Sequence, residues 1–244
     1  MAQHISRKEL KTDEVRESLV HGAEAVASHQ RQVWTIGGIV LVVALAIVGW
    51  RFYTQRQTLK AAAELDSAMK TFQAQVRDAN TPPEQPPMPG EVTYQDATTK
   101  FTDAEKQFAQ IAGKYPHTRP GLEAGYYDAL CDVQLNKNEQ AEKELKSIAS
   151  GSDADFAGLA NYQLALLYDK TGRGAQATAI YQQLVDKPTL LVPKALVLLS
   201  LADSYSKSNP AQATKLYNQI KQDYPDSQAA TQADEHLQMM NAKS

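Results

Sequence analysis

The stretch Ala177–Pro188 reads ATAIYQQLVDKP, and three related stretches recur in the chain. They are AEKQFAQIAGKYP from Ala104, AEKELKSIASGS from Ala141 and ATKLYNQIKQDYP from Ala213, which gives successive intervals of 37, 36 and 36 residues. Each begins with alanine, and a large apolar residue follows four positions later and an aliphatic one seven positions later. These residues are Phe108, Leu145, Tyr181 and Tyr217, and Ile111, Ile148, Leu184 and Ile220. The spacing places all three on one helical face, and a period of this length predicts a solenoid of helical repeats.

A second helical segment precedes each of the later three stretches. In the middle one the pattern consists of Leu164, Ala165, Tyr168, Gly172, Ala177, Tyr181 and Pro188. This pattern resembles the tetratricopeptide family, and the resemblance implies pairs of helices A and B that touch through small residues. The repeat at 122–151 is more divergent, with Asp132 where an aromatic residue is expected and Asn136 in place of glycine. The first pair is expected to combine residues 59–78 with 94–114, and 227–242 to form a terminal capping helix.

An uncharged run of 18 residues, VWTIGGIVLVVALAIVGW, covers Val33–Trp50 between Arg31 and Arg51. At about 1.5 Å per residue it spans roughly 27 Å, close to a bilayer core of about 30 Å. Tryptophan lies near both ends, as is typical of membrane interfaces. We therefore predict a transmembrane helix over 33–53 with the lipid bilayer as its partner. A cleaved signal peptide and a buried core helix are the alternatives, disfavoured by the 32 preceding residues and by the unbroken apolar length.

The remaining segments follow from helix breakers and charge. Residues 1–32 contain five basic and five acidic side chains and are expected to form a short amphipathic segment. Without Gly or Pro between Arg51 and Asn80, the membrane helix is expected to continue over 54–78 as the first solenoid helix. Residues 79–93 hold five of the eleven prolines and are predicted to be an extended loop. The repeat domain is expected over 94–244, so the fold class is all-α, a single transmembrane helix followed by a tetratricopeptide-repeat-like α-solenoid.

Composition argues against several functions. The 25 basic and 28 acidic residues leave a net charge of -3, without the positive excess that nucleic-acid binding needs. One cysteine excludes an internal disulfide framework and multi-cysteine metal motifs. The five histidines form no H-x-x-x-H pair, and neither a phosphate loop nor a G-x-S-x-G elbow occurs. We therefore expect no catalytic residue, cofactor, metal or small-molecule substrate, and we expect Cys131 and most tyrosines to be buried packing residues.

The tetratricopeptide resemblance also implies a binding surface, because stacked A helices line the concave face of such domains. Transferring the family's groove positions gives Tyr126, Leu130, Tyr162, Leu166, Leu199 and Asp203. The basic and amide residues of the family's carboxylate-binding clamp are missing at these places. The resemblance therefore implies other proteins as partners, bound through apolar or aromatic polypeptide segments.

The end of the apolar span, VGWRFYTQRQ, together with the repeat domain behind it, resembles the ancillary SecYEG translocon subunit family. That resemblance implies a bacterial inner-membrane protein with a cytoplasmic N-terminus and a periplasmic repeat domain. The implied role is a chaperone-like adaptor between translocon subunits, periplasmic chaperones and their clients. Charge favours the opposite orientation, because residues 12–32 carry two basic side chains and 51–70 carry four.

Two other functions remain open. The helix ends at Lys114–Thr118 and Tyr224–Ser227 share Tyr-Pro-x-[Ser/Thr] with outer-membrane assembly and Tol-Pal-associated repeat proteins, which suggests an envelope-assembly or cell-division adaptor. Those proteins are usually secreted or lipidated, and we expect this chain to be neither, which counts against this alternative. The second, a regulatory subunit or enzyme with its chemistry in residues 1–32, is disfavoured because that segment has few convergent polar groups.

Overall fold

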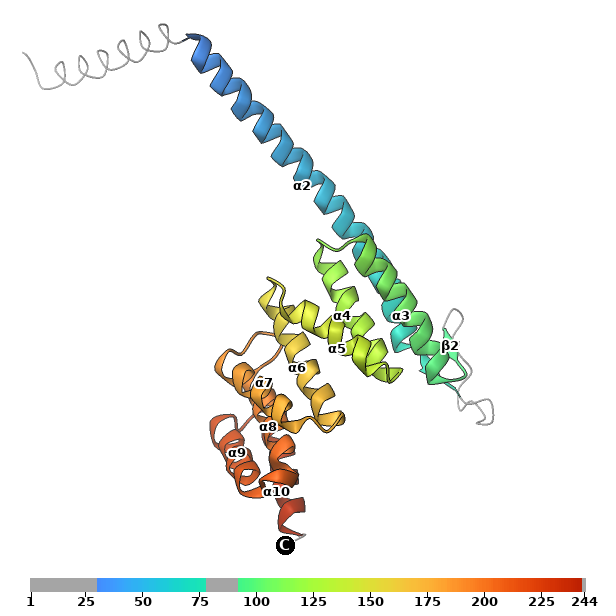
Figure 1. The fold of residues 1–244 in the computed structure, drawn as a ribbon, viewed down its shortest axis with the longest axis vertical. Coiled ribbons are helices and arrows are strands. Elements are labelled where there is room, and N and C mark those ends of the chain that lie inside the picture. The colour runs from blue at the N-terminus through green and yellow to red at the C-terminus, as the bar shows by residue number, and fades with distance from the viewer. Residues whose placement is uncertain (1–29, 78–91, 243–244) are drawn as a thin grey trace, which may run out of the picture. The chain divides into compact units, whose positions relative to one another are not determined.

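In the residues that the structure describes, the protein is all-α, as predicted, apart from one pair of two-residue strands (Figure 1). This computed structural model describes residues 30–77 and 92–242, so nearly all of the segment predicted over 1–32 and of the loop predicted over 79–93 lies outside the described residues. Within those ranges there are nine helices. They are α2 (Gln30–Gln73), α3 (Ala97–Lys114), α4 (Arg119–Gln134), α5 (Asn138–Ala149), α6 (Ala154–Lys170), α7 (Gly174–Asp186), α8 (Lys194–Ser208), α9 (Pro210–Asp223) and α10 (Gln228–Asn241).

Helix α2 contains the apolar run. Its N-terminal part belongs to a first compact unit that ends at Arg56, and its C-terminal part belongs to a second unit that begins at Gln57. It is the one helix in the described ranges that is long and apolar enough to cross a membrane. The mean hydropathy of its most apolar 18 residues is 2.1. No side chain in that apolar part is buried, so this part of α2 is not a core helix of the chain. A signal sequence meets the same criteria of length and composition.

In the second unit, the C-terminal part of α2 packs against α3 and α4. The apolar cluster that joins them consists of Ala61, Leu65, Ala68, Ala104, Phe108, Ile111, Tyr115, Ala124 and Cys131. The expected pairing of the first two solenoid helices is therefore present, but both helices are shorter than expected. Helix α2 ends at Gln73 because the following residues form strand β1 (Gln75–Val76), which pairs in parallel with β2 (Thr93–Tyr94). Helix α3 begins at Ala97 because the Asp96 carboxylate caps it.

The later helices form the predicted pairs α4–α5, α6–α7 and α8–α9, and α10 packs on α8 and α9. The alanines that open the four related stretches have no exposed surface, and the residue four positions later is at most 1% exposed in every case. These residues are Ala104, Ala141, Ala177 and Ala213, and Phe108, Leu145, Tyr181 and Tyr217. The repeat face read from the sequence is thus the face that the helix pairs bury.

The divergent repeat keeps the backbone of the standard turn. Gly172, between α6 and α7, has a φ of 77°, and Asn136, between α4 and α5, has a φ of 58°. Both lie in the left-handed region, which glycine enters freely and asparagine tolerates better than most residues. Asn136 therefore replaces the expected glycine without a change of turn.

Two corners between helices share the Tyr-Pro-x-[Ser/Thr] sequence. The Tyr115 N–H donates to Ile111 O at the end of α3, and Thr118 Oγ1 accepts the Gly121 N–H at the start of α4. Tyr224 and Ser227 make the equivalent bonds between α9 and α10. The tyrosine closes one helix, proline prevents its continuation, and the hydroxyl residue caps the next.

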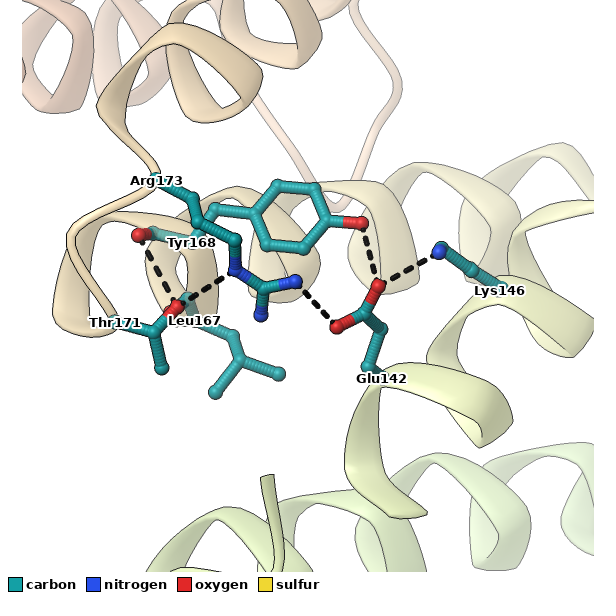
Figure 2. Close-up of polar contacts among 6 residues, drawn as sticks. All are labelled: Glu142, Lys146, Leu167, Tyr168, Thr171 and Arg173. Carbon is teal, nitrogen blue, oxygen red and sulfur yellow. Dashed lines mark hydrogen bonds and ion pairs between the residues drawn. The ribbon is translucent and has the colours of Figure 1, made fainter. Parts of the chain in front are cut away.

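A polar junction ties α5 to the turn between α6 and α7 (Figure 2). One Glu142 carboxylate oxygen accepts from Arg173 Nη1 at 2.6 Å, and the other accepts from Lys146 Nζ at 2.7 Å and from Tyr168 Oη at 3.0 Å. The Lys146 and Arg173 bonds lower the pKa of Glu142 to about 2. Arg173 also lies over the Tyr168 ring, 4.2 Å from its centroid. The junction therefore fixes one repeat against the next.

The first corner leads to a prediction about two glycines of α4. A Cβ atom on Gly121 would lie 1.9 Å from Tyr115 O, whereas one on Gly125 would meet nothing closer than 3.8 Å. We expect Gly121→Ala to lower the free energy of unfolding by about 1–3 kcal/mol, because the corner must shift. The matched control Gly125→Ala should raise it by about 0.5–1 kcal/mol through helix propensity.

Urea unfolding of the full chain in detergent, followed by circular dichroism, measures both changes. Equal stability of the two variants would contradict the close approach at this corner. The second corner carries Ala230 in the corresponding place, so its backbone already accommodates a Cβ atom.

Candidate functional site

Three neighbouring A helices, α4, α6 and α8, carry the six candidate binding residues, and each helix supplies two residues one turn apart. They are Tyr126 and Leu130 on α4, Tyr162 and Leu166 on α6, and Leu199 and Asp203 on α8. The α4 and α6 residues are half-buried, Leu199 is buried and Asp203 is exposed. Four of the six therefore combine partial exposure with apolar or aromatic surface.

A cavity of about 340 Å³ lies between α6 and α8, and we name it the α6–α8 cavity. Its lining consists of Leu166, Asp169, Tyr181, Ser200, Asp203, Ser204 and Lys207. The structure thus brings the candidates Leu166 and Asp203 together. The Tyr162 and Ser200 hydroxyls lie 2.8 Å apart and link the two helices at the cavity.

The other candidates lie elsewhere. Leu199 lines a second cavity of about 330 Å³ between the start of α8 and the start of α10. Tyr126 and Leu130 line neither cavity. Tyr126 packs beside the main apolar cluster and its ring meets that of Tyr127 edge-on, with 5.7 Å between centroids. Burial raises the pKa of Tyr126 to about 12, so it stays neutral.

Apart from Asp203, the polar side chains that line the α6–α8 cavity belong to residues that the sequence analysis missed. Asp169 accepts from Ser204 Oγ at 2.8 Å and from Tyr181 Oη at 3.1 Å, so one carboxylate joins three helices. Burial, and then Asp169 itself, raise the pKa of Tyr181. The available signal was helical spacing, because Asp169 lies one turn beyond Leu166 on the same helix.

This arrangement suits binding better than catalysis. The Tyr181 and Ser204 hydroxyls already donate to Asp169, and the lining contains no histidine that could act as a base. Among the residues that the structure describes, no group of three or more His, Cys, Asp or Glu side chains is placed to hold a metal ion. Cys131 is fully buried, and burial raises its pKa to about 12, so its thiol stays protonated.

A cluster of carboxylates lies in the divergent repeat. Asp132 is fully buried and Asp128 is 8% exposed, and neither Asp132 oxygen has a hydrogen-bond partner within the described part of the chain. Lys137 Nζ lies 3.6 Å from Asp132 Oδ1 and binds Glu105 more closely, at 2.6 Å. Burial, reinforced by Glu144, raises the pKa of Asp128 to about 7 and that of Asp132 to about 6. The folded protein therefore favours the protonated acids.

These raised pKa values predict a loss of stability with rising pH. The folded state holds protons on Asp128 and Asp132 that the unfolded state releases near pH 4, so the stabilisation present below pH 4 declines up to about pH 7. We expect the free energy of unfolding to fall by roughly 3–4 kcal/mol between pH 5 and pH 8, with the larger share from Asp128. Urea titrations of the full chain at both pH values measure the difference.

The double variant Asp128→Asn/Asp132→Asn should remove most of that difference, because amides do not titrate in this range. Asp186→Asn, on the exposed end of α7, is the matched control and should keep the wild-type dependence. An unchanged pH dependence in the double variant would contradict the assignment to this cluster.

Comparison with known families agrees with the geometry of the helix pairs. The family described as Tetratricopeptide repeat-like domain matches residues 29–189, about two thirds of the chain, and Tetratricopeptide repeat matches residues 196–227. A comparison with curated proteins gave no match. The long match covers α2 through α7 and the short one covers α8 and α9. The chain therefore belongs to the tetratricopeptide repeat-like domain family.

Proposed function

We propose that this protein is a membrane-anchored, non-enzymatic scaffold that binds polypeptides along the A helices of its repeat domain. Tetratricopeptide repeats imply protein partners in general. The observation that carries the proposal is the α6–α8 cavity, where apolar Leu166 lies beside Asp203 and the bonded pair Tyr162–Ser200. An extended segment can place an aliphatic or aromatic side chain there and donate backbone N–H groups to the exposed oxygens.

The anchor in this proposal is the apolar part of α2, over 33–53. From Trp34 to Tyr53 its side chains are exposed, as a lipid-facing helix requires, and Trp34 and Trp50 lie near its two ends. We place the N-terminus in the cytoplasm and the repeat domain in the periplasm of a bacterial inner membrane. This follows the resemblance to the ancillary translocon subunits rather than the local charge bias.

The finer part of the proposal places the scaffold beside the protein-translocation machinery. There it acts as a chaperone-like adaptor that receives emerging polypeptides. In this proposal the chain divides into five segments, 1–32, 33–53, 54–78, 79–93 and 94–244. The helix that crosses the membrane continues as the first helix of the solenoid, so the repeat domain is held close to the membrane. The alternative partners are envelope-assembly or cell-division proteins.

Topology can be tested by fusing alkaline phosphatase after Ser244. The enzyme is active only outside the cytoplasm, so we expect high activity in intact cells. A β-galactosidase fusion at the same residue is the control and should be inactive. Active β-galactosidase with inactive phosphatase would reverse the proposed orientation and follow the charge bias instead.

Photo-crosslinking tests the binding surface. A benzophenone amino acid at Tyr162 keeps an aromatic ring beside the α6–α8 cavity, and the same residue at Lys215, exposed on α9, is the matched control. We expect adducts with other polypeptides at position 162 at least about tenfold more abundant than at 215, because only the first borders a concave, partly apolar site.

The identity of the adducts separates the partner classes. Translocon subunits or their nascent clients would support the finer proposal, and envelope-assembly or division proteins would replace it with the alternative. Equal adducts at both positions, or none at position 162, would overturn the groove as the binding surface.

A further inference from the structure

A third cavity, of about 270 Å³, lies at the C-terminal end of the repeat domain, and we name it the α10 cavity. Its lining consists of Asp203, Ser206, Tyr217, His236, Met239 and Met240. The last three residues belong to α10 at positions i, i+3 and i+4, so they share one face of that helix. An imidazole and two thioethers therefore border the same space.

The histidine ring is held in a defined orientation. His236 Nδ1 lies 2.7 Å from Asp203 Oδ1 and 3.2 Å from Tyr217 Oη, and the two rings meet edge-on with centroids 5.4 Å apart. The Asp203 carboxylate is an acceptor, so the tautomer that satisfies this bond carries its hydrogen on Nδ1. Nε2 then keeps its lone pair. A carboxylate behind one imidazole nitrogen is the usual way in which proteins orient a histidine ligand toward a metal.

Hydrophobic packing explains the position of Met240 but not that of Met239. Met240 packs against the main apolar cluster, but Met239, which also lines the cavity, is 52% exposed. The chain has five methionines, and two of them are adjacent at this one cavity. A flexible apolar residue gains little from such exposure, whereas a thioether sulfur there is accessible to a ligand.

The chemistry of these donors selects a class of ion. Thioether sulfur is a soft ligand, suited to Cu(I) and poorly suited to Mg²⁺ or Ca²⁺, and imidazole complements it. We infer that the α10 cavity binds one Cu(I) ion through His236 Nε2 and the sulfurs of Met239 and Met240. Asp203 and Tyr217 act as positioning residues.

The sequence analysis led us to expect no metal, because it considered histidine pairs and multi-cysteine motifs, and His236-x-x-Met239-Met240 matches neither. The inference does not depend on the proposed binding of polypeptides. It uses a different cavity, which shares only Asp203 with the α6–α8 cavity, and its test contains no protein partner.

The test uses the untagged full chain in detergent, with Cys131→Ala in every sample so that no thiol competes for the ion. Methionine labelled with ¹³C at the ε-methyl group reports each thioether, and Ag(I) serves as a probe with the preferences of Cu(I) but no redox chemistry. We expect one equivalent of Ag(I) to shift the Met239 and Met240 methyl signals and to leave Met69, in the other apolar cluster, unchanged. Each signal is assigned from its Met→Leu variant.

Affinity for Cu(I) is then measured anaerobically by competition with bicinchoninate. Met239→Leu/Met240→Leu should weaken binding at least about 100-fold, since leucine preserves volume but has no sulfur. His236→Asn keeps a donor to Asp203 but loses Nε2, and should cost at least about tenfold. Asp203→Asn should cost about 10- to 100-fold, the range typical of partners that orient a ligand. The control Met69→Leu should bind as the parent does.

Thermal unfolding by circular dichroism confirms that each variant is folded before its affinity is compared. Unshifted Met239 and Met240 signals would overturn the site. So would wild-type affinity in the double leucine variant, or Zn(II) binding as tight as that of Cu(I).

Discussion

The close contact between paired helices, made through an alanine with no exposed surface, is the constraint on which the repeat domain depends. Because Ala104, Ala141, Ala177 and Ala213 carry only a methyl group, the two helix backbones can approach. The large side chain four residues later then fills the space beside the contact. A single pair leaves the rest of that side chain's face open to water, so each repeat needs the next one.

Tyrosine hydroxyls connect this apolar contact to the polar surface of the solenoid. Four tyrosines that are at most 4% exposed donate to a carboxylate on another helix or across a turn. The pairs are Tyr115–Glu64, Tyr168–Glu142, Tyr181–Asp169 and Tyr217–Asp203. A buried hydroxyl without a partner would destabilise the core, so each acid has a structural role. Asp169 and Asp203 also line cavities, so the bonds that satisfy the core fix the shape of the candidate sites.

Helix α4 is the place where the packing changes. Its Ala124 and Cys131 belong to the apolar cluster that includes α2 and α3, while Ala129 and Val133 belong to the larger cluster of the later repeats. The buried acids Asp128 and Asp132 belong to the same helix. Like charges in a low dielectric repel strongly, so protonation relieves a strain that a standard aromatic residue would not create. We therefore expect the buried acids of the divergent repeat to make the stability of the solenoid depend on pH.

The sequence by itself determined the helical class, the repeat period and the buried face, because these follow from periodicities of 3.6 and about 36 residues along one chain. It also determined the apolar helix, because the uncharged run Val33–Trp50 is unbroken. It also placed Leu166 and Asp203 among the candidates through the family pattern. Only the tertiary structure decided that α2 ends at Gln73, since a strand partner near Tyr94 takes over the backbone bonds. It likewise decided that Leu199 borders a different cavity from Leu166, and that His236 lies beside Asp203, 33 residues away. Contacts of this kind depend on how neighbouring repeats are rotated against one another, and helical spacing within a segment carries no information about that rotation.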